Sequence, residues 1–304
     1  VLAEAVGAPV ASTVNGKGVL DEAHPLSVGA SVRLRALQDE AATSDAVLVV
    51  GSELGDSDLW GGRITGRTLV RLDVDPAQLR KNAEPDLTLR ADADAGLRAV
   101  TALLEAPQAR GGEARADALR AACRKEALLD GAGYEQVNAA VRAALPADGV
   151  LAGDSSQVSY LGSVHFFAMP APRRFCYTPG FATLGYGLPA AVGAALAAPG
   201  RPVACLLGDG ALMFSVQELA TAVELGLPIP VVVVDNGGYA EIKAQQVARD
   251  IPPVAVDLRT PDLAALAVAM GARGVRVTDP AEVGEHVRAA LAATGPTVIH
   301  LDQR

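Results

Sequence analysis

Two polar residues, Asp209 and Asn236, each follow an apolar run and together offer the ligands of a divalent-metal site. The runs, residues 203–207 and 231–234, have the composition of buried strands. Carboxylate and amide oxygens are hard ligands of the kind that Mg²⁺ prefers, and Mg²⁺ commonly shares its coordination with phosphate oxygens. The residue types and their placement therefore predict a site for a divalent metal and a diphosphate.

Glycines on both sides of Asp209 fit this prediction, but they also have simpler explanations. Gly208 and Gly210 would let backbone N–H and C=O groups approach a ligand with no Cβ in the way. Gly-Asp-Gly alone is a common turn, and glycine-rich turns after a strand also form P-loops. No Lys-Ser or Lys-Thr pair follows these glycines, and Asn236 provides a second ligand that a plain turn would lack. The metal and diphosphate site is therefore favoured.

The stretch between the two turns has the signals of a helix. Ser215 is the candidate N-cap, because Glu218 follows it at the spacing of a capping box, and Gly226 with Pro228 provides the stop. The resulting order is strand, glycine turn, helix and strand. A right-handed crossover of this kind places both turns at the carboxyl ends of parallel strands, where open α/β folds bind their ligands.

The rest of the chain alternates short β runs with helical stretches, which predicts an α/β protein with two doubly wound parallel-sheet domains. In the first part we expect elements at residues 9–14, 32–42, 47–50, 69–74, 76–81 and 95–104. In the second part we expect them, beside the motif region, at 134–145, 149–153, 184–198, 275–277 and 297–301. Residues 105–113 contain Pro, Gly and charge and are interpreted as a linker, so the domains are expected at 1–106 and 114–304.

Composition and charge narrow the function classes. Half of the 304 residues are hydrophobic, which is enough for two cores, and the formal net charge is −9. The basic residues are scattered singly, so we expect no nucleic-acid partner. No apolar stretch reaches the ~18 residues of a membrane-spanning helix. We therefore expect a cytoplasmic protein with no membrane partner.

The motif region resembles a known enzyme family. Residues 208–222, GDGALMFSVQELATA, followed by Asp235-Asn236-Gly237, are similar to the thiamine-diphosphate motif of acetolactate synthase-like enzymes and 2-oxoacid decarboxylases. Residues 184–191, LGYGLPAA, are also typical of that group. Segments similar to the family's middle domain lie at residues 7–10, 16–19, 24–26 and 73–76. The resemblance implies a Rossmann-like middle domain, truncated at its N-terminal edge, followed by the diphosphate-binding domain.

The resemblance also implies a thiamine diphosphate site with Mg²⁺ as its metal. The implied metal ligands are the side chains of Asp209 and Asn236 and the backbone carbonyl of Gly238. N–H groups of Gly210 and Ala211 would contact the diphosphate, and a nearby helix start would add favourable partial charge. Further cofactor contacts are implied for Gly208, Gln157, Ala182, Thr183, Leu184 and Tyr239.

Three of these positions carry more specific expectations. Leu184 would be the bulky apolar residue under the cofactor that forces its folded, catalytic conformation, and it would also fit plain helix core. Ala182 would accept a hydrogen bond from the cofactor's 4′-amine through its backbone carbonyl. Gln157 follows a strand end and resembles a second diphosphate contact, although a loop with an exposed amide has the same pattern.

Glu241 follows the loop at residues 236–239, which carries predicted cofactor contacts, closely enough for its side chain to face the substrate. Leu184 and Glu241 are the two candidate catalytic residues. A carboxylate taken out of water needs a cation. The segment NGGYAEI, residues 236–242, resembles decarboxylases of 5-guanidino-2-oxopentanoate, the 2-oxoacid of arginine, whose guanidinium a carboxylate can bind through two hydrogen bonds. We hypothesise that Glu241 binds a cationic substrate tail. The alternative is a solvated glutamate at a helix start, paired with a nearby Lys or Arg.

For the activity, the resemblance implies thiamine-diphosphate- and Mg²⁺-dependent non-oxidative decarboxylation of a 2-oxoacid, with 5-guanidino-2-oxopentanoate as the candidate substrate. An acetolactate synthase-type carboligase is the alternative, but these synthases carry a Trp after the cofactor loop, whereas Trp60 is the only Trp in the chain.

The family's site forms between two subunits, which implies a homodimer or homotetramer. The family's N-terminal domain, which supplies a catalytic glutamate, has no counterpart in these residues. A third alternative is therefore a cofactor-binding fragment that is inactive by itself.

The first domain shows no dinucleotide-binding pattern. The segment after the run 47–50 begins Gly51-Ser52-Glu53 and does not continue as G-x-G-x-x-G. Some relatives hold FAD or ADP in the middle domain, but Glu53 stands where the family's flavin binders carry Arg. This difference argues against FAD.

Overall fold

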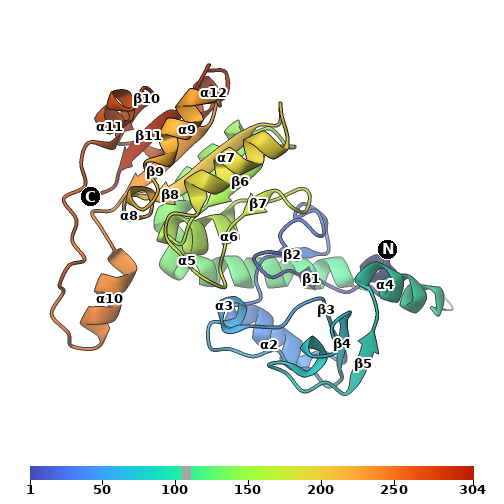
Figure 1. The fold of residues 1–304 in the computed structure, drawn as a ribbon. Coiled ribbons are helices and arrows are strands. Elements are labelled where there is room, and N and C mark those ends of the chain that lie inside the picture. The colour runs from blue at the N-terminus through green and yellow to red at the C-terminus, as the bar shows by residue number, and fades with distance from the viewer. Residues whose placement is uncertain (105–110) are drawn as a thin grey trace. The chain divides into compact units, whose positions relative to one another are not determined.

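The structure, a computed structural model, describes residues 1–104 and 111–304 (Figure 1). These residues form two compact units, Val1–Leu129 and Asp130–Arg304. Each unit contains a parallel sheet with helices packed on it, so the predicted fold class, α/β with two doubly wound parallel-sheet domains, is confirmed. No helix in the described residues is both long and apolar enough to cross a membrane.

The first unit is built on a three-stranded parallel sheet. Its strands lie in the order β3 (Val47–Val50), β4 (Leu69–Asp73) and β5 (Leu87–Arg90), and a separate parallel pair joins β1 (Val10–Ala11) to β2 (Ser27–Gly29). The other elements are α1 (Leu2–Val6), α2 (Arg35–Thr43), α3 (Asp56–Leu59), the 3₁₀ turn η1 (Gln78–Arg80) and α4 (Ala93–Ala102). The sequence does not predict β2 and β5, because segments of three and four residues are too short for a periodicity to stand out.

One helix, α5 (Gly112–Ala144), occupies the region where the sequence predicts the end of a linker and a shorter helix at 134–145. Residues 105–110 of the predicted linker lie outside the described residues. The helix is 33 residues long and starts immediately after Gly111. The predicted helix is therefore correct at its C-terminal end and too short at its start.

The division between the two units falls within α5, after Leu129, whereas the sequence pattern indicates a domain boundary at 106–114. Side chains in the first half of α5 form hydrogen bonds with backbone groups elsewhere in the first unit. Glu126 accepts hydrogen bonds from the N–H groups of Arg35 and Ala36 at 2.8 and 2.9 Å. These contacts give no local sequence signal, and the domain limits of 1–106 and 114–304 stay a prediction.

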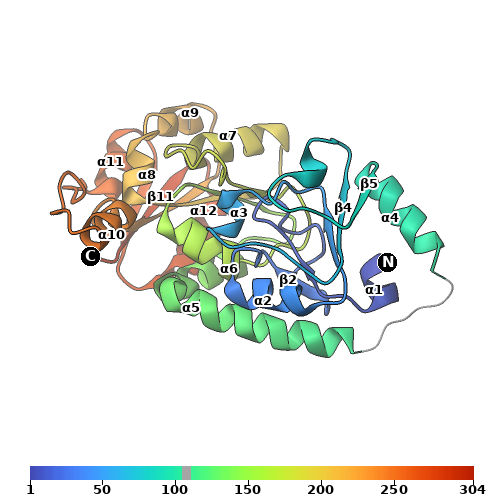
Figure 2. The same cartoon turned by 90° about the horizontal axis from the view of Figure 1, so that it is seen from below.

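The second unit is a six-stranded parallel sheet with helices on both faces (Figures 1 and 2). The strand order is β10 (Arg273–Val277), β11 (Thr297–Asp302), β9 (Pro230–Asp235), β8 (Val203–Gly208), β6 (Val150–Gly153) and β7 (Phe175–Cys176). The helical elements are the π-helical segment η2 (Val158–Ser163), α6 (Val164–Phe166), α7 (Gly187–Ala197), α8 (Asp209–Met213), α9 (Glu218–Glu224), α10 (Ala240–Ala248), α11 (Leu263–Ala269), η3 (Pro280–Glu282) and α12 (Val283–Leu291).

Side chains of the central strands alternate between two cores. Along β8, Val203, Cys205 and Leu207 pack with α7, α9 and α11. Ala204 and Leu206 pack with α5 and α12 on the other face. Because both faces are buried, these strands are continuous apolar runs rather than alternating patterns. Double burial also fixes the register, since a slip of one residue would move every side chain to the opposite face.

The helix start predicted at Ser215 is wrong. Helix α9 begins at Glu218 after Gln217, with no side-chain cap, and the Ser215 Oγ is buried without a partner among the described residues. The Gly-Asp-Gly turn is itself the start of the short helix α8. Turns at residues 214–217 join α8 to α9, so Ser215 lies within this run of turns and not at the start of a helix.

Candidate cofactor and metal site

Three neighbouring strands of the second unit, β6, β8 and β9, end at the same edge of the sheet. Asp154 follows β6, Asp209 follows β8 as the first residue of α8, and Asn236 follows β9. The predicted parallel pairing of the two motif strands is confirmed, with Gly208 opposite Val234. The fold therefore brings Asp209 and Asn236 to adjacent strand ends.

Asp209 is a buried carboxylate, with 1% of its surface exposed. Its Oδ2 accepts a hydrogen bond from the Thr260 hydroxyl at 2.8 Å. Burial raises the pKa of Asp209, the hydrogen bond from Thr260 lowers it, and the charge of Asp235 raises it further. A cation beside this carboxylate would favour its ionised form, so the environment suits a metal ligand.

Asn236 presents an amide oxygen that is buried and has no hydrogen-bond partner among the described residues. Leaving such an atom unsatisfied costs ~1–3 kcal/mol, and a coordinated cation would remove that cost. In the part of the chain that the structure describes, no group of three or more His, Cys, Asp or Glu side chains could hold a metal. A metal at Asp209 and Asn236 would therefore also need backbone and ligand oxygens, which is how Mg²⁺ binds together with phosphates. The residues present fit Mg²⁺ and a diphosphate.

The glycines around these ligands have no room for a side chain. A Cβ at Gly210 would lie 2.7 Å from the Tyr239 ring, and one at Gly238 would lie 2.1 Å from the Val256 carbonyl oxygen. Gly238 also has a φ of 141°, a conformation that other residues rarely adopt. Ala211, the next predicted diphosphate contact, is buried in α8. Neighbouring protein groups, a tyrosine ring at Gly210 and a backbone carbonyl at Gly238, therefore require these glycines independently of any ligand.

The loop after β9 is held by a segment that sequence reasoning missed. The Tyr239 N–H donates to the Val256 carbonyl at 2.8 Å, and the Leu258 N–H donates to the Gly237 carbonyl at 3.0 Å. The two stretches run antiparallel across an isolated bridge at Gly238. They are separated in sequence by all of α10, so no local pattern predicts their pairing.

Asp154 holds the segment that carries the other predicted cofactor contacts. Its carboxylate is fully buried and accepts hydrogen bonds from the backbone N–H groups of Gly187 at 2.7 Å and Gly185 at 3.2 Å. Burial raises the pKa of Asp154, and these N–H groups lower it. The loop before α7 is thereby attached to the end of β6.

The remaining predicted contacts lie on or beside this loop. Leu184 is half-buried against the core, but it lies in the turn before α7, which begins at Gly187 and not at 184 as expected, so it is not helix core. Its contact with a cofactor stays a prediction. Ala182 and Thr183 precede it in an exposed stretch, and Ala182 has a φ of 51°. Gly208, on β8, donates its N–H to the Ser156 hydroxyl at 3.1 Å.

Glu241 and Gln157 meet where β6 ends and α10 begins. The half-buried Glu241 accepts hydrogen bonds at Oε2 from Gln157 Nε2 at 3.3 Å and from the Tyr160 hydroxyl at 3.4 Å. Its Oε1 accepts from Gln245 Nε2 at 2.9 Å. None of the described Lys or Arg side chains forms an ion pair with it, and the nearby Lys243 binds Asp257 instead. The carboxylate thus has neutral donors and no cation.

Tyr134, on α5, is a site residue that sequence reasoning missed. Its hydroxyl donates to Gln157 Oε1 at 2.9 Å. Burial raises the pKa of Tyr134, the polar Asn236 side chain nearby lowers it, and the charges of Asp209 and Glu241 raise it. One phenol therefore lies among the predicted metal ligands, the predicted diphosphate contact and the predicted substrate carboxylate.

Two buried side chains, Asp235 on β9 and His300 on β11, form a pair next to the loop that carries Asn236. The Asp235 Oδ2 and the His300 Nε2 are 2.8 Å apart, and neither side chain is exposed. The Asp235 Oδ1 accepts the N–H of Gly237 at 3.0 Å. Because Asp235 directly precedes Asn236, these bonds fix the backbone from which Asn236 leaves the strand.

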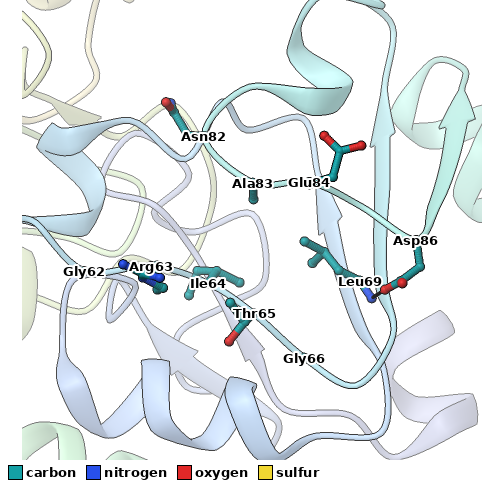
Figure 3. A pocket seen from close by; sticks show the side chains of 10 residues that line it. All are labelled: Gly62, Arg63, Ile64, Thr65, Gly66, Leu69, Asn82, Ala83, Glu84 and Asp86. Carbon is teal, nitrogen blue, oxygen red and sulfur yellow. Dashed lines mark hydrogen bonds between the residues drawn. The ribbon is translucent and has the colours of Figure 1, made fainter.

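The first unit has a cavity of its own, of about 460 Å³ (Figure 3). Arg63 lines it from one loop, and Asn82, Glu84 and Asp86 line it from another. Asp86 is already engaged, because it accepts the Leu69 N–H at 2.7 Å. The side chains that line the cavity carry charges of both signs, which does not indicate a nucleotide site. The expectation that FAD does not bind therefore stays a prediction.

Comparison with known proteins identifies the family. Residues 1–100 match the model of the thiamine pyrophosphate enzyme central domain, and residues 156–301 match that of the C-terminal TPP binding domain. The chain belongs to the thiamine pyrophosphate enzymes. The predicted cofactor, thiamine diphosphate, is thereby confirmed, with Mg²⁺ as its usual partner in this family.

Curated relatives of this thiamine pyrophosphate enzyme chain include decarboxylases and synthases. A probable 2-ketoarginine decarboxylase from Pseudomonas aeruginosa is 37% identical over 99% of the chain and 54% of its own length. An acetolactate synthase large subunit from Parasynechococcus marenigrum is 32% identical over 100% of the chain and 51% of its own length. The acetolactate synthase isozyme 1 large subunit from Escherichia coli is 31% identical over 81% and 44%. The chain spans about half the length of the curated relatives it matches.

We predict that Gly238→Ala destabilises the loop after β9, because the new Cβ would collide with the Val256 carbonyl at a disfavoured φ. The free energy of unfolding, measured by urea denaturation, should fall by ~1–3 kcal/mol. Gly193→Ala is the matched control, because nothing lies within 4 Å of its Cβ and α7 should gain ~0.5–1 kcal/mol from Ala. A Gly238→Ala protein as stable as the unmodified one would contradict this loop geometry.

We also predict that Asp154→Asn loosens the loop before α7, because an amide offers only one acceptor atom to the N–H groups of Gly185 and Gly187. Hydrogen exchange at these two backbone amides should become faster, and unfolding free energy should fall by ~1–3 kcal/mol. Asp148→Asn, at an exposed position, should change neither quantity. Unaltered exchange at residues 185 and 187 in Asp154→Asn would refute the role given to this carboxylate.

Proposed function

We propose that the complete protein is a carboxy-lyase that decarboxylates 5-guanidino-2-oxopentanoate non-oxidatively, with thiamine diphosphate and Mg²⁺. The observation that carries the proposal is Glu241, whose half-buried carboxylate is bonded by neutral groups and by no cation among the described residues. A buried carboxylate of this kind is stabilised when a cationic ligand pairs with it. The name of the Pseudomonas relative supports this substrate, since 2-ketoarginine is the same compound.

The residues at the sheet edge would hold the cofactor. Thiamine diphosphate, when bound, supplies a thiazolium ring that takes up the electron pair released with CO₂. The side chains of Asp209 and Asn236 and the carbonyl of Gly238 would bind Mg²⁺, and the N–H groups of Gly210 and Ala211 would bind the diphosphate. Leu184 would support the bent cofactor, Ala182 would accept from its amine, and the contacts would be completed by Gln157, Thr183, Gly208 and Tyr239.

Glu241 would select the substrate by charge and shape. A guanidinium is planar and can donate two parallel hydrogen bonds to one carboxylate. Tyr160 and Gln157 donate to the Oε2 of Glu241, which fixes the plane of the carboxylate before a substrate arrives. Pyruvate carries no cation and would leave this carboxylate without a charge partner, so it should be the poorer substrate.

An acetolactate synthase-type carboligase is the second candidate. The identity to two acetolactate synthase large subunits favours it. In that case pyruvate would be the substrate, and a second carbonyl compound would accept the two-carbon unit. A chain that binds the cofactor without turnover is a third candidate, because the chain covers only about half the length of its relatives.

We further propose that the protein is a homodimer or homotetramer in the cytoplasm, without a nucleic-acid or membrane partner. Large apolar side chains near the candidate site support assembly, because Phe181 is 95% exposed, Phe214 56% and Val254 66% in the single chain. Large apolar side chains that are exposed in a single chain are commonly covered at protein interfaces. The net charge of −9 disfavours a nucleic-acid partner.

The substrate prediction is tested by CO₂ release from 5-guanidino-2-oxopentanoate and from pyruvate, with the complete protein, thiamine diphosphate and Mg²⁺. We expect kcat/KM to be ~10- to 100-fold higher for the guanidino acid, because a hydrogen bond to a charged group contributes ~1.5–3 kcal/mol. Preference for pyruvate with formation of acetolactate would support the carboligase. The third candidate is tested with residues 1–304 alone: cofactor binding without CO₂ release from either acid, beside turnover by the complete protein, would support it.

The role of Glu241 is tested by Glu241→Gln in the same protein. KM for the guanidino acid should rise by ~10- to 100-fold through loss of the charge-assisted bonds, whereas KM for pyruvate should change little. Glu285→Gln is the matched control, since Glu285 also lies in the first turn of a helix, α12, but is exposed. Equal effects of Glu241→Gln on both acids would show that this carboxylate does not recognise the substrate charge.

A further inference from the structure

Thr260 lies in a short stretch of the second unit that contacts the ends of two strands, β8 and β9, from which the predicted metal ligands leave the sheet. Its hydroxyl oxygen is 2.8 Å from the Oδ2 of Asp209, which follows β8. Two residues earlier, the N–H of Leu258 donates to the carbonyl of Gly237, in the loop after β9, at 3.0 Å. Residues 256–260 therefore hold together two neighbouring strand ends.

The hydrogen bond between Thr260 and Asp209 has one possible direction. An ionised carboxylate only accepts hydrogen bonds, so the hydroxyl donates its proton to Oδ2. Asp209 is 1% exposed, so bulk water does not compete for this bond. Fixing Oδ2 sets the plane of the carboxylate. It thereby also sets the direction of Oδ1, the oxygen that carries no bond to Thr260.

The Thr260 hydroxyl starts from a backbone that is restricted on its C-terminal side as well. Pro261 follows and disfavours the helical conformation at residue 260, and a β-branched side chain has few rotamers on such a backbone. Helix α11 is capped by Asp262, whose Oδ1 accepts the N–H of Ala265 at 3.0 Å. The start of this helix therefore does not need the Thr260 hydroxyl.

A metal ligand binds well when its oxygen is already directed at the ion, and a hydrogen bond to the ligand from a neighbouring group commonly provides this orientation. We propose that Thr260 is a positioning residue that directs the Asp209 carboxylate toward Mg²⁺, an inference that rests on the proposed cofactor site. The two residues are 51 positions apart, and all of α10 lies between them in the sequence. The fold and not a local pattern brings them together.

Anchoring of the chain is the competing explanation for Thr260. In that case its hydroxyl would only fasten the stretch that returns from α10, and metal binding would not depend on it. Two backbone bonds report on this fastening, because the N–H groups of Tyr239 and Leu258 both pair the returning stretch with the loop after β9. Loss of the hydroxyl should therefore affect metal binding in one explanation and these two amides in the other.

The test is Thr260→Val in the complete protein, with Mg²⁺ affinity measured by calorimetric titration in the presence of thiamine diphosphate. Valine keeps the branched side chain and lacks the hydroxyl. We expect Mg²⁺ to bind ~10- to 100-fold more weakly, the usual effect of removing a group that orients a metal ligand. Thr260→Ser keeps a hydroxyl and should retain most of the affinity. Hydrogen exchange at the Tyr239 and Leu258 amides of the metal-free protein should stay unchanged in both variants.

Thr221→Val is the matched control. Thr221 is also half-buried, and its hydroxyl donates at 3.4 Å to a carboxylate oxygen, Glu218 Oε2, that is not a predicted metal ligand. The substitution thus removes the same kind of bond from the same unit. Its Mg²⁺ affinity should equal that of the unmodified protein.

Four results would overturn the inference while the proposed cofactor site stands. They are an unchanged Mg²⁺ affinity in Thr260→Val, an equal loss in Thr260→Ser, an equal loss in Thr221→Val, and faster exchange at the Tyr239 and Leu258 amides in Thr260→Val. The last result would show that the hydroxyl anchors the chain. Failure of the unmodified protein to bind Mg²⁺ with thiamine diphosphate would overturn the cofactor site as well.

Discussion

Parallel pairing of β6, β8 and β9 is the constraint on which the candidate site depends. Each strand is buried on both faces, so its register is fixed by two cores at once. Because the strands are parallel and adjacent, the residues that follow them leave the sheet at one edge. The pairing of β8 with β9 is therefore enough to bring Asp209 and Asn236 to adjacent positions.

Buried polar groups then fix the loops that leave this edge. Asp154 binds the backbone N–H groups before α7, and Asp235 binds both His300 and the Gly237 N–H. These carboxylates are buried, so a hydrogen bond lost by one of them is not replaced by a bond to water, and its loss costs free energy. The edge of the sheet is consequently held by polar bonds, while its centre is held by apolar packing, and the predicted metal ligand Asn236 follows a backbone fixed by these bonds.

The sequence predicts the strands and the metal ligands of this region because their signals are local. Runs such as 203–207 and 231–234 are apolar throughout, and the structure extends each by only one or two residues. The cap at Ser215 is predicted wrongly, because the spacing of a capping box does not reveal that the preceding turn is already helical. Tyr134 is missed for a different reason. Its place on α5 marks it only as a residue facing the sheet, and its partner Gln157 is brought to it by the fold.

The hydrogen bonds from Tyr134 to Gln157 and from Gln157 to Glu241 have a consequence for how substrate preference can diverge among such enzymes. If residue 241 became apolar to suit a neutral oxoacid, Gln157 would lose the acceptor that orients its amide, and the Tyr134 hydroxyl would lose the fixed position of its own acceptor. A change of substrate would then leave two polar side chains without fixed partners beside the predicted cofactor site. Variants with a new specificity should therefore tend to acquire a second substitution, at 134 or 157, that removes these unpaired groups.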